Sequence, residues 1–286
     1  MRGRITIWET RTSKGAICHA FTLIELVVVM TVIAILAALL MPALAKSKMN
    51  AQQINCLSNV RQITVASLMY MSDTGQNMRY NDSGMPEFDP SWPITLWMGS
   101  LSDYGVTDQL QLCPSTRQPS PVQNTAVWGT ASIAWNWGVN LMPPITGSYG
   151  FNGWLWSFAP GTNFYRSGTF PTFVFPKPTS IQRTTQTPLF FDSIWVCSWP
   201  IENDTPATDL YSGAPIVNTL GMQRCTILRH DGKLATSSYP FHGQRQSLPG
   251  AINMGLADGH AELSPLRNLW NYYWHLDWNP AKVKAP

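Results

Sequence analysis

The chain has 286 residues, which is enough for one large domain or two small ones. Only 12% of the residues are charged, and 13 Trp, 9 Tyr and 11 Phe are present, a composition that excludes a disordered chain. The first 20 residues hold four of the 19 basic and one of the 16 acidic side chains, so the remainder is electrically balanced. Because the remainder has no basic excess, nucleic acid is not an expected partner.

Residues 26–45 form a 20-residue apolar run interrupted only by Thr31, long enough to cross a bilayer as a helix. Basic residues precede the run, so the positive-inside rule places the N-terminus in the cytoplasm. A cleaved secretory signal ending at Ala45 is the alternative, although its apolar region would normally have about 7–15 residues. Glu25 also argues against that alternative, because a carboxylate at a membrane is costly and is expected to be functional.

Residues 20–25 read Ala-Phe-Thr-Leu-Ile-Glu and are followed by the apolar run. This order resembles the processing signal of type IV prepilins and type II secretion pseudopilins. The resemblance implies that prepilin peptidase cuts between Ala20 and Phe21 and that Phe21 is then N-methylated. Ala20 stands where the family usually has glycine. Pro42 falls where these proteins commonly kink the N-terminal helix.

The resemblance also implies assembly with other pilin or pseudopilin subunits in a homo- or hetero-filament. After cleavage, the α-amino group of Phe21 is the cation at the level of Glu25. We expect the amine of a neighbouring subunit to pair with this carboxylate, because an unpaired charge in a membrane is costly. Glu25 would then set the register of assembly.

The helix is predicted to continue past the membrane, since no glycine occurs between Gly15 and Gly75. It would run from Phe21 to Ser72, roughly 78 Å. Residues 1–20 form the leader, 21–45 the transmembrane part and 46–72 an amphipathic part. The amphipathic part carries a one-sided apolar stripe typical of a packed helix, namely Ile54, Leu57, Val60, Ile63, Leu68 and Met71.

Residues 73–286 hold 21 of the 22 prolines and 18 of the 20 glycines, with short apolar runs between them. They predict an antiparallel β-rich head domain, so the fold class of the whole chain is α+β. Asp258-Gly259 predicts a hairpin whose tight turn needs a positive φ at both positions. We expect strands at 173–175, 189–191, 195–197, 225–228 and 252–254, and a helix within 266–275 at most.

Asp258-Gly259 also resembles the end of a C-terminal signature of a pseudopilin-like family, in which a histidine precedes Asp-Gly by nine residues. The spacing here is different, because His242 leaves 15 intervening residues and His230 leaves 27. Which histidine corresponds is open at this point.

Of five cysteines, Cys18 lies in the leader and would be removed with it. The four that remain, an even number in an exported domain, suggest two disulfides with three possible connectivities. We prefer Cys56–Cys113, which would tie the helix to the head, and Cys197–Cys225, which would join neighbouring strands. Free buried thiols are the alternative.

The chain contains no His-Glu-x-x-His, Gly-x-Ser-x-Gly or P-loop motif, so we expect no enzymatic activity, cofactor or resident metal. Related pseudopilins can hold calcium in the head. Residues 73–77 are acidic and turn-like but depart from the EF-hand pattern, and no calcium ligand is assigned.

The sequence therefore predicts a single-pass inner-membrane protein with its head in the periplasm or outside the cell. Its expected role is that of a pilin-like subunit of a type II secretion pseudopilus or a type IV pilus-like filament. Two alternatives are an exported hydrolase, disfavoured by the missing motifs, and a membrane-anchored carbohydrate-binding protein. The latter would use tryptophans that could equally form the core: Trp92, Trp97, Trp128, Trp135, Trp137, Trp154, Trp156, Trp195 and Trp199.

Overall fold

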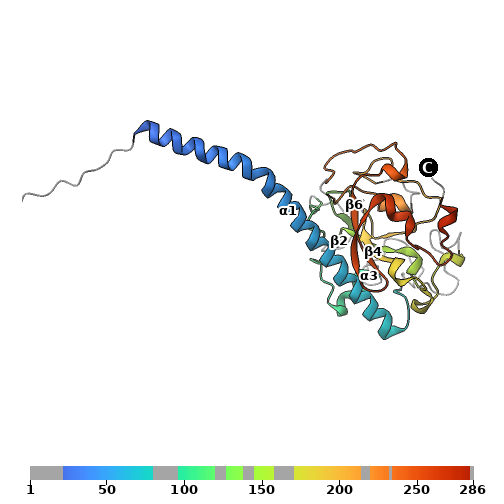
Figure 1. The fold of residues 1–286 in the computed structure, drawn as a ribbon. Helices are drawn as coiled ribbons and strands as arrows, with labels where there is room; N and C mark the ends of the chain where they lie inside the picture. Colours follow the sequence, from blue (N-terminus) through green and yellow to red (C-terminus); the bar gives the residue numbers. More distant parts are fainter. Residues whose placement is uncertain are drawn as a thin grey trace, which may run out of the picture. The chain divides into compact units, whose positions relative to one another are not determined.

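The computed structural model describes residues 22–79, 96–119, 127–137, 145–157, 171–213, 220–231 and 234–283. The chain divides into two compact units, Met1–Lys46 and Ser47–Pro286. One long helix, α1, contributes to both units, and the described strands belong to the second (Figure 1). The predicted class is confirmed: a long N-terminal helix is followed by a β-rich head, and the fold is α+β.

Helix α1 spans Leu23–Thr74, two residues beyond the predicted end, and contains Pro42. It ends at Gly75, which adopts the left-handed conformation with φ of 67°. The Gly75 N–H donates to the carbonyl oxygen of Met71 at 3.0 Å. A glycine in this conformation satisfies a terminal carbonyl and stops the helix without the steric cost of a side chain.

Only the second half of α1 has a buried face. Within the predicted stripe, Val60, Ile63 and Met71 are buried, whereas Ile54 is 63% exposed and lies off the packed face. The face is completed by small and polar side chains that the stripe did not include, because the backbone approaches the head closely there. The buried residues of α1 are Cys56, Val60, Ile63, Thr64, Ala66, Ser67 and Met71.

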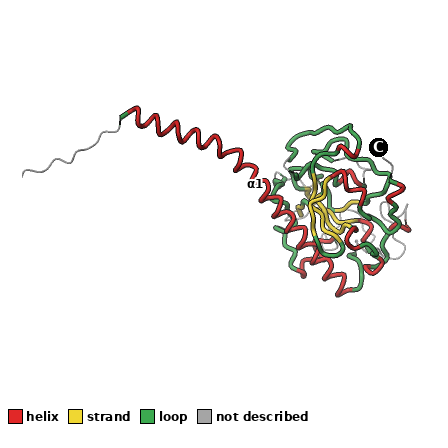
Figure 2. Tube along the Cα trace, viewed as in Figure 1, coloured by secondary structure: helices red, strands yellow, loops and turns green. Residues whose placement is uncertain are grey.

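The head is built on a five-stranded sheet in the order β5-β3-β4-β6-β7. Figure 2 shows the strands of the head in yellow. Strands β3 and β5 are parallel, and the other neighbours are antiparallel. Every residue of the central strands β4 and β6 is buried, so both faces of the sheet are covered. The strands are β3 (Tyr149–Asn152), β4 (Pro188–Asp192), β5 (Cys197–Ser198), β6 (Ala251–Leu256) and β7 (Ala261–Pro265). A separate antiparallel pair consists of β1 (Trp135–Trp137) and β2 (Ile145–Gly147).

The second half of α1 packs directly against β6 at Gly255. A Cβ added there would overlap the hydroxyl of Thr64 and would lie 3.2 Å from Cγ1 of Val60. Tyr149 of β3 donates its hydroxyl to the carbonyl oxygen of Cys56 at 3.5 Å. Gly255 therefore allows a close approach between helix and sheet.

Several predicted elements are wrong in detail. Residues 225–228 form no strand, because their backbone groups bond to separate segments: Cys225 N–H donates to Met222 and Leu228 N–H to Leu210. Residues 173–175 are no strand either, and β5 begins only at the end of 195–197. The predicted C-terminal helix is a 3₁₀ helix, η8 (Leu266–Asn271). The other short helices are α3 (Trp97–Leu101), η1 (Ser102–Tyr104), η2 (Gly153–Leu155), η3 (Pro171–Phe173), η4 (Pro178–Ser180), η5 (Thr184–Gln186), η6 (Met222–Arg224), η7 (Arg245–Ser247) and η9 (Pro280–Lys282).

Strands β6 and β7 form the predicted hairpin, in the register Met254 opposite Glu262. Its turn differs from the prediction, because Gly259 has a positive φ of 92° and Asp258 does not. The Gly259 N–H donates to the carbonyl of Leu256 at 2.9 Å, and Leu256 N–H donates to His260 at 2.9 Å. This pattern is a three-residue loop that ends in a left-handed glycine, which twists the strands as a two-residue turn would.

Candidate functional site

The start of α1 is closed by a reciprocal pair of hydrogen bonds between Thr22 and Glu25. The Thr22 N–H donates to Oε2 of Glu25 at 2.9 Å, and the Glu25 N–H donates to Oγ1 of Thr22 at 3.3 Å. The Thr22 hydroxyl also donates to Oε2, at 2.7 Å. This is a capping box, in which each side chain satisfies a backbone donor of the first turn. In the unprocessed chain, Glu25 therefore has a partner within its own helix.

The first half of α1 has no packed face of its own. Its described side chains are exposed from Leu23 to Lys46 except for Ala37, which is partly buried. Leu39 is 72% exposed and Leu44 is 71% exposed. By length and composition the helix could cross a membrane, with a mean hydropathy of 2.9 over its most apolar 18 residues. An apolar surface of this extent needs lipid or another protein to cover it.

The two residues of the expected cleavage junction, Ala20 and Phe21, lie outside the described residues. Pro42 lies inside α1, as expected, where it removes one backbone donor from the helix. The structure of a single uncleaved chain does not test pairing between Glu25 and the amine of a neighbour. That pairing stays a prediction.

A disulfide ties the second half of α1 to the loop at Cys113. Cys56 and Cys113 are bonded with a Cα–Cα distance of 4.9 Å, 57 residues apart in sequence. The same loop accepts two amide hydrogen bonds from α1: Gln52 Nε2 donates to Pro114 O and Asn59 Nδ2 to Leu112 O, both at 3.0 Å. The predicted pairing of Cys56 with Cys113 is confirmed.

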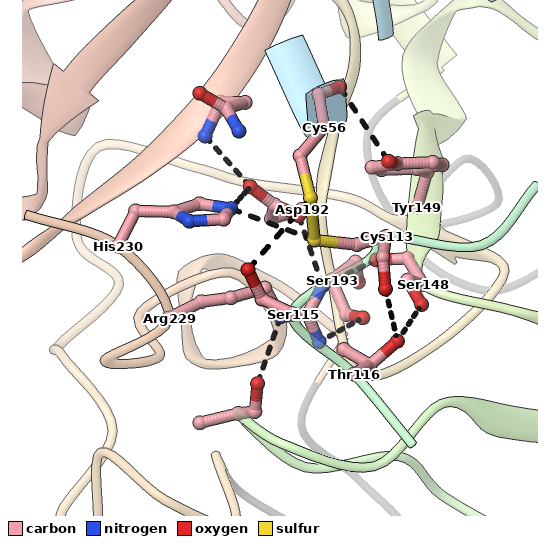
Figure 3. A network of polar contacts seen from close by, with 12 residues as sticks. Cys56, Cys113, Ser115, Thr116, Ser148, Tyr149, Asp192, Ser193, Arg229 and His230 are labelled. Atoms are coloured by element: carbon pink, nitrogen blue, oxygen red, sulfur yellow. Dashed lines mark hydrogen bonds and ion pairs between the residues drawn. A yellow bond between two sulfur atoms is a disulfide. The ribbon is translucent and has the colours of Figure 1, made fainter. Parts of the chain in front are cut away.

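Arg229 and Asp192 form a buried ion pair next to this disulfide (Figure 3). Arg229 Nη1 lies 3.0 Å from Oδ1 of Asp192, and both side chains are fully buried. Arg229 also donates to four backbone carbonyls, at 2.6–3.3 Å, from Thr130, Ala131, Ser148 and Ser193. A buried guanidinium is tolerated when its charge and its donors are satisfied in this way.

The other oxygen of Asp192 contacts His230, and His230 contacts the disulfide. Asp192 Oδ2 lies 3.2 Å from Nε2 of His230 and accepts the Asn253 N–H at 2.7 Å. The same Nε2 lies 3.7 Å from Sγ of Cys113. Burial raises the pKa of Asp192, but His230 and Arg229 outweigh burial and hold the pKa below its ordinary value. Asp192 is therefore an ionised carboxylate in the protein interior.

The second expected disulfide is wrong, because Cys197 and Cys225 are free buried thiols. The Cys225 thiol donates to the carbonyl oxygen of Met222 at 3.2 Å, whereas Cys197 lies 3.8 Å from Nη1 of Arg224. Burial raises the pKa of both thiols. A buried thiol with a raised pKa is a poor nucleophile, so these two cysteines serve as small core residues.

The two candidate motif histidines lie in different environments. His230 is buried and forms a β-bridge to Ala251, the first residue of β6. His242 is exposed, in the segment between that bridge and the hairpin. At the hairpin loop, Asp258 Oδ1 accepts the His260 N–H at 3.1 Å and contacts Nδ1 of the same histidine at 2.6 Å. The hairpin thus begins beside His230 and turns at Asp258-Gly259.

The tryptophans of the head are core residues where the structure describes them. Trp128 is partly buried and stacks on Trp195 with ring centroids 4.3 Å apart. Trp92 and the side chain of Trp137 lie outside the described residues. Rings held inside the core offer no stacking surface for a sugar, and nothing supports the carbohydrate-binding alternative. The buried ones are Trp97, Trp135, Trp154, Trp156, Trp195, Trp199, Trp270, Trp274 and Trp278.

Three participants in these sites were missed by the sequence analysis. Thr22 carries a readable signal, since threonine three residues before glutamate at the start of an apolar run is the capping-box pattern. Asp192 and Arg229 show no recognisable pattern in the sequence, because they are isolated charges 37 residues apart that meet only in the folded head.

Residues 16–41 match the family model described as the prokaryotic N-terminal methylation motif. The chain carries a prepilin-type methylation motif. The match includes Ala20, Phe21 and Glu25 and extends into the apolar half of α1. No curated protein and no solved structure was found to match the chain. The motif supports a type IV pilin-like substrate of prepilin peptidase, a structural subunit rather than an enzyme, and anchoring in a membrane.

Proposed function

We propose that the chain is a pilin-like structural subunit that prepilin peptidase processes between Ala20 and Phe21. The mature protein is anchored in the inner membrane by the first half of α1, with its head on the extracytoplasmic side. It assembles through this helix with other pilin or pseudopilin subunits into a type II secretion pseudopilus or a type IV pilus-like filament. The observation that carries the proposal is the methylation motif at residues 16–41.

Two features of the described residues support the proposal. The helix into which the motif extends is mostly apolar over Leu23–Ala45 and is exposed there apart from Ala37, so it needs a covering of lipid or of neighbouring helices. The second half of the same helix is held by the head through the Cys56–Cys113 disulfide and a buried face. A helix whose first half is exposed and whose second half is packed on the head suits a subunit that contacts other subunits through the first half.

Mass spectrometry of the mature N-terminus tests the processing step. The expected N-terminal residue is N-methylated Phe21. A mature chain that begins at Lys46 would identify a cleaved secretory signal and overturn the proposal, and so would an intact Met1 in cells that contain the peptidase.

The role of Glu25 in assembly is tested by a matched pair of variants. Glu25→Gln removes the charge but keeps the capping box, because glutamine can also accept the Thr22 N–H. Thr22→Ala removes the hydroxyl of the capping box but keeps the charge. If the carboxylate pairs with the amine of a neighbour, Glu25→Gln chains are processed but enter filaments poorly, and Thr22→Ala chains enter them normally.

The opposite result would assign Glu25 to helix capping alone. Filament entry can be measured by fractionation of sheared filaments and by cross-linking between subunits. Normal entry of Glu25→Gln would overturn the charge-pairing mechanism and leave the pilin-like assignment standing.

We infer that His230, and not His242, is the counterpart of the histidine in the family signature that ends at Asp258-Gly259. The inference is supported by the β-bridge from His230 to Ala251 at the start of β6. The segment 231–250, between the histidine and the hairpin, would then contain an insertion of 18 residues, the difference between 27 and nine intervening residues. Deletion of the exposed part of this segment, including His242, should leave the head folded; loss of the fold would contradict the inference.

A further inference from the structure

The structure assigns a latent divalent-metal site to Cys56, Cys113 and His230, with Asp192 as the fourth ligand, in the chain whose Cys56–Cys113 disulfide is reduced. The sulfur atoms of the two cysteines and a ring nitrogen of His230 all lie within 4.8 Å of one another, and all three residues are buried. Two thiolates, an imidazole and a carboxylate form a donor set that zinc prefers.

The distances around His230 already match those of a tetrahedral ion. Zinc bonds of about 2.3 Å to sulfur and about 2.0–2.1 Å to nitrogen and oxygen place neighbouring ligand atoms roughly 3.3–3.8 Å apart. Nε2 of His230 lies 3.7 Å from Sγ of Cys113 and 3.2 Å from Oδ2 of Asp192. Figure 3 shows that the imidazole faces both groups. Reduction of the disulfide releases the two sulfurs, which must move apart to bind one ion. The Asp192 carboxylate, which does not belong to the group of ligand atoms within 4.8 Å of one another, must move toward the sulfurs to complete the site.

The charges also balance. In the oxidised chain, the buried Asp192 carboxylate is compensated by Arg229 at 3.0 Å. Reduction and metal binding add two thiolates and one divalent cation, so the buried cluster gains no net charge. An uncompensated charge would be costly at this depth, and this arrangement avoids it.

A further feature fits a metal site. Asp192 Oδ2 accepts the Asn253 N–H at 2.7 Å, and such a hydrogen bond orients a carboxylate ligand.

The chemistry has two steps. An external dithiol reduces the disulfide by exchange: the Cys56–Cys113 bond breaks, the dithiol closes to its own disulfide, and two electrons and two protons pass to the cysteines. The metal ion then displaces the two thiol protons and binds the thiolates. An external disulfide reverses the sequence and releases the ion. The ion would therefore tether α1 to the Cys113 loop whenever the covalent bond is open.

Cobalt(II) is a direct probe, because tetrahedral cobalt–thiolate sites give a charge-transfer band in the near ultraviolet and intense visible bands. The full-length chain in detergent is compared after oxidation and after reduction by a phosphine. The expected result is one equivalent of cobalt bound to the reduced chain, displaced by zinc, and no thiolate bands from the oxidised chain.

Matched variants locate the site. His230→Gln should weaken cobalt binding by at least about tenfold, since even the loss of an outer-shell partner has such an effect. His242→Gln should bind as the wild type, because that histidine is exposed and apart from the cluster. The double variant Cys197→Ser/Cys225→Ser keeps the two cysteines of the site and should retain the bands.

Near-ultraviolet circular dichroism reports whether the reduced chain stays folded. If it unfolds without metal, addition of cobalt should restore the fold together with the bands. Three results would overturn the proposal: no thiolate bands in the reduced chain, equal bands in the oxidised chain, or bands that are lost in the Cys197→Ser/Cys225→Ser variant.

Discussion

Replacing Gly255 with alanine tests how closely α1 packs on the sheet. Gly255 lies in β6, where all six residues are buried. In a strand interior, alanine is normally better than glycine by roughly 0.5–1 kcal/mol, because glycine loses more conformational entropy on folding. Without a close contact to the helix, Gly255→Ala would therefore stabilise the protein.

The structure predicts that Gly255→Ala instead destabilises the protein. The added Cβ would overlap Oγ1 of Thr64, and it would also lie 3.0 Å from Cβ of Thr64 and 3.2 Å from Cγ1 of Val60. Thr64 cannot easily turn away, since it is fully buried and its hydroxyl donates to the Val60 carbonyl at 2.7 Å. The helix must shift from the sheet, and overpacking of this kind costs about 1–3 kcal/mol.

A double-mutant cycle isolates the contact. Thr64→Ala removes the overlapping hydroxyl and leaves only distances of 3.0 and 3.2 Å, which need shifts of a few tenths of an ångström. Gly255→Ala should therefore cost less in the Thr64→Ala background, with a coupling energy of about 0.5–3 kcal/mol. Denaturant unfolding of the full-length chain in detergent, followed by tryptophan fluorescence, measures all four free energies. A stabilising Gly255→Ala, or additive effects, would refute the packing argument.

Removal of the disulfide by Cys56→Ala/Cys113→Ala should lower the free energy of unfolding by about 4 kcal/mol, the chain-entropy value for a 57-residue loop. Denaturant titration measures this loss, and a far smaller loss would contradict the prediction. Gly259→Ala should cost roughly 1–2 kcal/mol, because φ is 92° there, and the added Cβ would make only an ordinary contact, at 3.4 Å, with Cδ1 of Leu68; an unchanged midpoint would contradict this backbone strain. Burial raises the pKa of Glu202, but the hydrogen bond to His275 helps to outweigh it and hold the pKa below 4.5. This stabilisation is present above pH 4.5 and is lost as the pH falls through the lowered pKa, so Glu202→Gln should flatten the acid limb of the stability profile.

The sequence predicted correctly those elements that depend on interactions between residues close together in the chain. The long helix follows from an apolar run without glycine, and it ends at the next glycine, Gly75. The hairpin follows from Asp258-Gly259 between alternating apolar residues. The conformation of its turn was predicted wrongly, because Asp-Gly also fits a loop in which only the glycine needs a positive φ.

The missed features depend on contacts between distant segments. An even number of cysteines suggested two bridges, yet the thiol of Cys225 bonds to a carbonyl within its own turn and the bond to Cys197 does not form. Arg229 is an ordinary cation in the sequence, and only the fold shows that four carbonyls and one carboxylate surround it. Residues 225–228 are buried although they form no strand. The hydrophobic pattern of such a short buried segment cannot be distinguished from that of a buried strand.

Glu25 and Asp192 are carboxylates in very different surroundings, one exposed at the start of α1 and one fully buried in the head. Asp192 is fully buried, and Arg229, His230 and the Asn253 N–H satisfy it permanently within one head. Among the described residues, Glu25 has its partner, Thr22, in its own first turn, and the apolar side chains that follow it are exposed. The capping box is a local contact that involves no cation, so we expect the Glu25 carboxylate to accept a cation from a second subunit. Asp192 is already paired with Arg229 and is not available in this way. The head therefore satisfies its buried carboxylate within one chain, whereas the exposed apolar surface of the first half of α1 needs a membrane or other subunits to cover it.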